Sequence, residues 1–140
     1  KTLSLQNVRH SFSGETPQKT IHAVGPIGFA LEEGEFVAIV GPSGCGKSTL
    51  LRLTAGLLVA DQGTICFAGE RIDGPSPRRG MVFQQPALFP WLDVTGNVAF
   101  GCRFRALGRT ASRDLTAELI SAVGLEGFEQ FYPNALSGGM

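Results

Sequence analysis

The segment that most constrains the fold of this chain is residues 41–48, GPSGCGKS, which fit the pattern G-x-x-x-x-G-K-[ST] at every fixed position. Residues 36–40 before it, FVAIV, form a continuous apolar run that is typical of a strand covered on both faces. Residues 48–58 after it predict a helix that ends near Gly56. Strand, glycine-rich loop and helix in this order predict an α/β core built around a phosphate-binding loop. The apolar face of the predicted helix carries Leu50, Leu53, Thr54 and Leu57.

The residue types in this loop suit a polyphosphate. Gly44 and Gly46 permit the positive φ angles that let backbone N–H groups converge on an anion. Lys47 is placed to reach the β- and γ-phosphates, and the Ser48 hydroxyl to bind Mg²⁺. Thr49 is placed to donate to the α-phosphate. The simpler alternative is a glycine-rich turn that only joins a strand to a helix. The remaining loop residues are Gly41, Pro42, Ser43 and Cys45, the last interpreted as a small filler and not a nucleophile.

In the rest of the chain, the predicted secondary structure changes from strands to helices near residue 92. Before it, short apolar runs predict strands at residues 2–8, 20–24, 27–31, 64–69 and 80–84, with the first three antiparallel because their connections are short. After it, helices are predicted at residues 95–100 and 112–123. Residues 1–92 are therefore interpreted as a nucleotide-binding core with an antiparallel β portion, and residues 93–140 as a helical subdomain. In the second helix, the repeating apolar residues are Leu115, Leu119 and Val123, with Gly124 at the end.

Charge and cysteine content exclude several classes of protein. The chain has 12 acidic and 12 basic residues, so a broad electrostatic surface for nucleic acid or an anionic membrane is not expected. The 3 cysteines, Cys45, Cys66 and Cys102, lack zinc-ligand spacing and predict reduced thiols in a cytosolic protein. No secretory leader is recognised, and no apolar stretch reaches the ~20 residues of a membrane span. Any work at a membrane is expected to go through a partner.

Three segments in a fixed order carry a family resemblance. They are the phosphate loop, MVFQQPALFPWLDV at residues 81–94, and LSGGM at residues 136–140. Together they resemble the nucleotide-binding subunit of ATP-binding-cassette (ABC) transporters over essentially the whole chain. Within that family, the QQPALFPWL and YPNALSGGM segments look most like importers of the nitrate, sulfonate and taurine group.

The resemblance implies that the second glycine-rich loop, whose LSGG at residues 136–139 is the family's signature, serves a different copy of the chain. In this family two subunits pack head to tail, and the Ser137, Gly138 and Gly139 loop of each closes over ATP held by the phosphate loop of the other. A serine hydroxyl and two unobstructed glycine N–H groups suit a γ-phosphate, beside a helix expected to begin there. A flexible tail is the alternative for this segment taken alone.

Three further residue roles follow from the resemblance. Gln84 matches the glutamine that reaches Mg²⁺ or the attacking water; the alternative is a buried glutamine at a strand end. Phe12 matches the aromatic that stacks on adenine, a position more often tyrosine; the alternative is a core residue. Phe89 and Trp91, in the apolar run at residues 86–92, are expected to help form a groove for a permease helix. The alternative for that run is burial in the helical part.

The family pattern continues beyond the signature, with a strand ending in Asp-Glu and a switch histidine that this sequence does not show. Three hypotheses remain open: an ATPase subunit of a membrane importer with ATP and Mg²⁺ as ligands, a nucleotide-binding module without hydrolysis, and a soluble P-loop phosphotransferase. The first implies a permease, a second copy, an external solute-binding protein and a location on the cytoplasmic face of the membrane. Simple structural or surface roles are expected for His10, His22, Arg78, Arg79, Arg103, Arg105 and Arg109.

Overall fold

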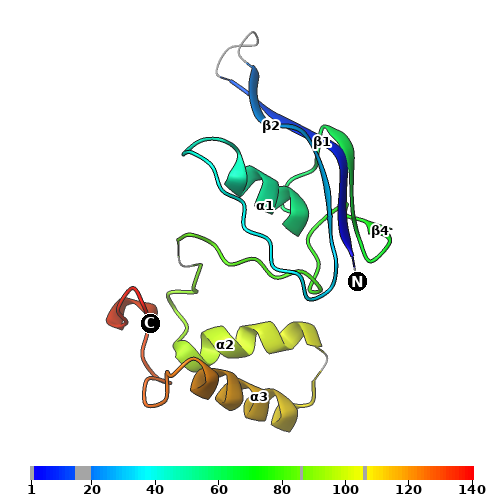
Figure 1. Ribbon diagram of the computed structural model, residues 1–140. Helices are drawn as coiled ribbons and strands as arrows, with labels where there is room; N and C mark the ends of the chain where they lie inside the picture. The colour runs from blue at the N-terminus through cyan, green and yellow to red at the C-terminus, as the bar shows by residue number, and fades with distance from the viewer. Residues whose placement is uncertain (1, 15–19, 86, 106) are drawn as a thin grey trace. The chain divides into compact units, whose positions relative to one another are not determined.

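The structure is a computed structural model that describes residues 2–14, 20–85, 87–105 and 107–140. The chain divides into two compact units, Lys1–Val82 and Phe83–Met140, each of which is considered by itself. The first holds a sheet and one helix, and the second holds the remaining helices (Figure 1). The predicted division into a core and a helical subdomain at residue 92 stays a prediction.

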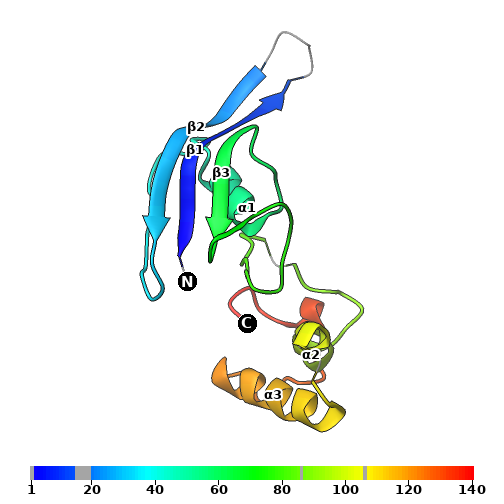
Figure 2. The same cartoon turned by 90° about the vertical axis from the view of Figure 1, so that its right-hand side faces the viewer.

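The first unit is built on a four-stranded antiparallel sheet in the order β2-β1-β3-β4. Its strands are β1 (Leu3–Ser13), β2 (Thr20–Leu31), β3 (Gln62–Phe67) and β4 (Glu70–Arg71). The β1–β3 ladder ends at the pair Arg9 and Gln62, whereas the β1–β2 ladder continues to Ser13 and Thr20. The long β1–β2 hairpin therefore runs on beyond the end of β3 (Figure 2).

Two strands predicted at residues 20–24 and 27–31 are one strand, β2. Gly25 and Pro26 do not break the strand but lie in a β-bulge. Val24 pairs with His10 and Ile27 with Val8, so β2 has one residue more than β1 between these two pairs. The missing N–H of a proline is tolerated there because β2 is an edge strand of the described sheet.

The predicted strands at residues 36–40 and 80–84 are wrong for this structure. Both segments lack regular secondary structure, and Phe36, Val40 and Val82 are 92%, 90% and 96% exposed. A strand requires a hydrogen-bonded neighbour, and no described strand pairs with either segment. The apolar composition was recognised correctly, but the predicted burial was not.

Helix α1 (Lys47–Ala55) packs on the sheet and closes the core of the first unit. It ends at Gly56, as predicted, with Leu50 and Leu53 buried. Leu57 lies beyond the helix and is 42% exposed, so the predicted apolar face was one residue too long. The buried core residues are Leu5, Val8, Val24, Leu50, Leu53, Ile65 and Ile72.

The second unit contains α2 (Val94–Cys102), the short helix η1 (Arg103–Arg105), α3 (Arg109–Ala122) and η2 (Pro133–Ala135). Both long helices were predicted. The face of α3 was not, since Thr116 and Ile120 are buried while Leu119 and Val123 are 42% and 67% exposed. The hydroxyl of Thr116 donates to the Ser112 carbonyl at 2.7 Å, which allows a polar side chain to be buried.

Candidate nucleotide-binding site

The phosphate loop lies against strand β2. Gly46 precedes α1 with φ 91°, and Gly44 has φ 79°, so both adopt the left-handed region that favours glycine. A Cβ at position 46 would overlap the carbonyl of Ala23 on β2 and lie 3.6 Å from Cγ2 of Val24. The loop therefore seats on the sheet at a position that only glycine fits, which fixes where α1 begins.

The first turn of α1 presents backbone donors. No described side chain caps this end of the helix, and the Leu50 N–H is bonded to the Gly46 carbonyl at 2.9 Å. The preceding N–H groups, of Lys47, Ser48 and Thr49, have no acceptor within the described part of the chain. Free donors at the positive end of a helix dipole form a site for an anion.

The side chain of Lys47 folds back over the loop. Its Nζ donates to the carbonyls of Gly41 and Pro42, both at 2.7 Å, and lies 3.6 Å from Sγ of Cys45. The Cys45 thiol also packs against Gly41, where a Cβ would come within 2.8 Å of the sulfur. An ammonium group and a set of N–H donors thus share one loop. This donor set fits a polyphosphate, and the exposed Ser48 hydroxyl fits an oxygen ligand for Mg²⁺.

Phe12 stands near the end of β1, paired with Ile21 across the hairpin. It is 39% exposed and lies outside the buried core cluster. Its ring meets that of His10 edge to face, with centroids 4.7 Å apart and an interplanar angle of 88°. An aromatic ring is thus held at the edge of the unit that carries the phosphate loop.

The other predicted site residues belong to the second unit. Gln84 is exposed and does not end a strand, so the buried strand-end alternative is wrong. Ser137 begins a turn in which the Met140 N–H donates to its carbonyl at 3.0 Å, and the helix expected to begin there stays a prediction. Gly138 and Gly139 are exposed, and a Cβ at either would meet no atom within 4 Å. The signature loop is therefore open to an incoming group.

The apolar loop before α2 separates its two aromatic residues. Phe89 packs on Phe100 of α2, with ring centroids 4.5 Å apart, and on Trp91 at 5.5 Å. Trp91 is 69% exposed, whereas Phe89 is half-buried. Phe89 therefore fits the alternative of burial in the helical part, whereas Trp91 fits the expected exposed surface. Pro86, the first residue of the predicted run, lies outside the described residues.

Several structural residues escaped the sequence analysis. Asn97 accepts from the Phe89 N–H at 2.8 Å and donates to the carbonyls of Phe89, Leu92 and Asp93, which fixes the loop to α2. No motif marks it, because an asparagine inside a helix has many uses. Asp61 lies 3.3 Å from Nδ1 of His10, although 51 positions separate them in sequence.

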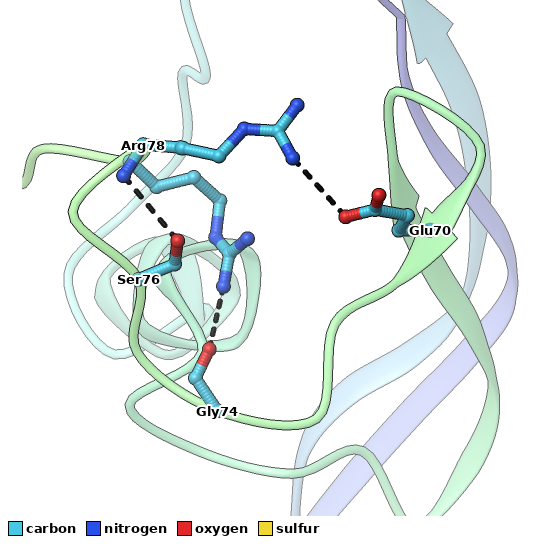
Figure 3. A network of polar contacts seen from close by, with 5 residues as sticks. Glu70, Gly74, Ser76 and Arg78 are labelled. Atoms are coloured by element: carbon cyan, nitrogen blue, oxygen red, sulfur yellow. Dashed lines mark hydrogen bonds and ion pairs between the residues drawn. The ribbon is translucent and has the colours of Figure 1, made fainter.

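Arg78 and Arg79, for which simple structural or surface roles are expected, differ in exposure, because Arg78 is exposed and Arg79 is not. The Arg78 side chain donates to Glu70 at 3.1 Å, and the Arg78 backbone N–H donates to the Ser76 hydroxyl oxygen (Figure 3). The Arg78 guanidinium also lies 5.5 Å from the centroid of the Phe67 ring. Arg79 is half-buried and donates to the Gly74 carbonyl. The charged ends of both side chains therefore have partners close by in the chain. Arg103, Arg105 and Arg109 are exposed, as predicted.

Residues 24–140 match the sequence profile of the ABC transporter family. The chain belongs to the ABC transporter family. This assignment does not favour the soluble phosphotransferase hypothesis.

The three cysteines are free, no described helix has the length and apolarity needed to cross a bilayer, and the described residues contain no group of three or more metal-binding side chains.

The chain is similar to curated importer subunits. It is 46% identical over 136 residues to the taurine import ATP-binding protein TauB of Pelagibacter ubique, covering 96% of this chain and 51% of the relative. It is 44% identical over 139 residues to the aliphatic sulfonates import ATP-binding protein SsuB of Bacillus cereus, covering 99% of this chain and 53% of the relative. The ABC chain described here thus spans about half the length of these relatives.

Among solved structures, a dimeric ATP-binding cassette in a post-hydrolysis state, bound to ADP and Pi, is similar with a TM-score of 0.85 and 30% identity. The match covers 97% of this chain and 63% of that one. A dimeric bacterial ABC transporter cassette gives a TM-score of 0.86 at the same identity and coverage. The fold is therefore that of the first part of an ABC cassette.

Proposed function

We propose that the full-length protein containing this ABC chain binds and hydrolyses ATP to power a membrane importer. The observation that carries the proposal is the phosphate loop, in which Lys47 and the uncapped first turn of α1 supply a charge and free N–H donors to one anion site. Because the chain belongs to the ABC transporter family, the anion proposed for this site is the polyphosphate of ATP. The cell location follows as the cytoplasmic face of the membrane, reached through a permease.

In this proposal each of these residues contacts a different part of the Mg-ATP complex. Lys47 contacts the terminal phosphates, Ser48 holds Mg²⁺ with Gln84, and Thr49 donates to the α-phosphate. Phe12 stacks on the adenine ring. Bound Mg²⁺ would neutralise charge developing on the phosphates during in-line attack, and Gln84 would orient the water. These assignments rest on the resemblance and on the accessibility of the side chains.

A second copy of the chain completes the site. Ser137, Gly138 and Gly139 present a hydroxyl and two unobstructed N–H groups to the γ-phosphate bound by the partner, and their openness supports this role. ATP then favours the closed pair, and hydrolysis releases it, so nucleotide turnover can move a permease between two states.

Mixing two inactive full-length variants tests this arrangement. Lys47→Ala removes the phosphate-loop charge and Ser137→Ala removes the signature hydroxyl, so each variant alone should lose most ATPase activity. In a head-to-tail pair, a mixed dimer keeps one intact site, and equal mixing should restore about a quarter of the wild-type rate. Activity that stays absent after subunit exchange, verified by mass spectrometry, contradicts a shared site. Unimpaired hydrolysis by Lys47→Ala contradicts the function itself.

The permease is expected to contact Trp91, which is 69% exposed in an otherwise apolar loop. Trp91→Ser should therefore abolish co-purification of the permease while leaving ATP binding unchanged. Val123→Ser is the matched control, because Val123 is 67% exposed in the same unit, at the end of α3. Intact complex formation by Trp91→Ser would show that the loop is not the docking surface.

The names of the relatives suggest the cargo class. Since the similar curated proteins are named for taurine and aliphatic sulfonate import, we propose a sulfonate-like anion as solute. Specificity would lie in the permease and an external solute-binding protein. Growth on taurine or alkanesulfonates as the sole sulfur source, with and without the gene, measures this assignment.

A further inference from the structure

A buried histidine lies beside the aromatic residue that is proposed to hold adenine. His10 is 9% exposed and is one of two buried polar residues in the described chain. Its ring stands at 88° to that of Phe12, two positions further along β1, with 4.7 Å between centroids. A perpendicular contact at this distance is a favoured geometry for two aromatic rings. His10 therefore restricts the plane of the Phe12 ring.

Asp61 holds this part of β1 in place. Its Oδ2 accepts from the Ser11 N–H at 2.7 Å, and its own N–H donates to the Arg9 carbonyl at 2.9 Å. Its Oδ1 lies 3.3 Å from Nδ1 of His10, a close contact whose geometry falls short of a hydrogen bond. Because the β1–β3 ladder ends at Arg9, the Asp61 carboxylate continues that edge by one more contact. The backbone on both sides of His10 is thus clamped.

One residue, Val24, lies between His10 and the phosphate loop. His10 pairs with Val24 across the hairpin, and Val24 is the side chain nearest to the position of a Cβ on Gly46. Phe12, His10, Val24 and the start of α1 therefore form a continuous series within one unit. The series runs from the proposed base contact to the proposed phosphate contact.

We propose that His10 is a positioning residue for nucleotide binding: clamped beside Asp61, it fixes the ring of Phe12 in the plane that stacks on the base. This inference rests on the proposed ATP-binding function. His10 itself need not touch the nucleotide. Its effect should appear in the affinity for ligands that carry a base and be absent from the affinity for phosphates alone.

Calorimetric titration of the full-length protein with Mg-ATP and with Mg-tripolyphosphate separates these two contributions. His10→Leu keeps an apolar side chain of similar size but removes the ring, and should weaken Mg-ATP binding about three- to tenfold, the value of one aromatic pair. Binding of Mg-tripolyphosphate should not change. His10→Phe restores a ring and should return the Mg-ATP affinity toward that of the parent.

A double-mutant cycle with Phe12→Ala gives the second readout. If His10 acts through Phe12, His10→Leu should cause no further loss of Mg-ATP affinity once Phe12 is alanine. His22→Leu is the matched control: His22 also lies in the hairpin, bonds Ser11 at 3.0 Å and is exposed, so its replacement should leave both affinities unchanged. Where His10→Leu does not fold, His10→Gln replaces it, with the same expected loss.

Equal losses for Mg-ATP and Mg-tripolyphosphate would assign His10 a purely structural role and overturn the inference. An unchanged Mg-ATP affinity, or additive losses in the double variant, would overturn it too. Failure of the parent protein to bind Mg-ATP is a different result, because it overturns the proposed function before any variant is compared.

Discussion

At the scale of single residues, the two left-handed glycines of the phosphate loop meet different surroundings. Gly46 faces the Ala23 carbonyl, which a Cβ would overlap, while a Cβ on Gly44 would meet no atom within 4 Å. Both have positive φ, 91° and 79°. Backbone strain is therefore common to the two positions, and steric exclusion by the sheet acts at Gly46 alone.

We expect Gly44→Ala to lower the free energy of unfolding by about 1–2 kcal/mol, the cost of a left-handed alanine. Gly46→Ala should cost more, because either β2 or the start of α1 must move. Chemical denaturation of the full-length variants measures the difference, with Gly138→Ala as a control at a glycine that has open space around it. Equal losses at the two loop positions would contradict the steric argument.

At the scale of elements, α2 holds the second unit together through its first turn. The Asp93 side chain accepts from the Gly96 N–H at 2.7 Å and caps the helix. The backbone N–H groups of Val94 and Thr95 donate to the carbonyls of Phe131 and Glu129, both at 3.0 Å. The start of one helix thus joins the loop before it and a turn more than thirty residues later.

Asn97→Ala should destabilise the full-length protein by about 2–3 kcal/mol, because it leaves half-buried backbone groups of the 89–93 loop without partners. The same change should increase hydrogen exchange at the Phe89 amide. Thr110→Ala, on exposed surface in α3, is the control. Unaltered exchange at Phe89 would show that the amide does not hold the loop.

Glu129 gives the second unit a dependence on pH. Hydrogen bonds to its carboxylate from backbone N–H groups, chiefly that of Gly127 at 3.0 Å, hold the pKa of this carboxyl below its ordinary value. A lowered pKa adds stability above the unfolded-state value, and this is lost as pH falls through the folded value. The Tm difference between wild type and Glu129→Gln should therefore be small but positive at pH 7 and shrink as the pH falls below the unfolded-state pKa of the carboxyl.

Glu126→Gln, an exposed neighbour in the same turn, serves as the control for that pH series. A difference that grows on acidification would have the wrong sign and contradict the argument.

The sequence predicted local structure best at positions where the residue type has few structural uses. The phosphate loop, the end of α1 at Gly56 and the existence of α2 and α3 follow from glycine chemistry and apolar spacing. The bulge at Gly25 and Pro26, the face of α3 around Thr116, and the meeting of His10 with Asp61 do not, because each depends on a partner distant in the chain. The site residues proposed in the second unit are predicted from motifs alone.

At the scale of the whole molecule, residues 36–40 expose apolar side chains, although their continuous apolar run predicts a buried strand. The chain spans about half the length of its curated relatives, and we expect the rest of the cassette to pair with this segment. Phe36 and Val40, 92% and 90% exposed, are the side chains that would then be covered.

Residues 1–140 produced alone should therefore bind an environment-sensitive dye and self-associate, and the pair Phe36→Ser and Val40→Ser should reduce both. In the full-length protein, the same pair should instead destabilise the fold by about 3–6 kcal/mol, from two lost buried side chains. Dye fluorescence and denaturation measure the two effects. No destabilisation of the full-length protein would mean that the segment stays uncovered there.

The bulge in β2 has a consequence for how copies of this protein meet. Among the described strands β2 forms one border of the sheet, and Pro26 withholds a donor where the bulge interrupts the regular repeat of the backbone. A foreign strand finds no continuous template along that border. Extension of the sheet from one molecule to the next is therefore disfavoured along β2.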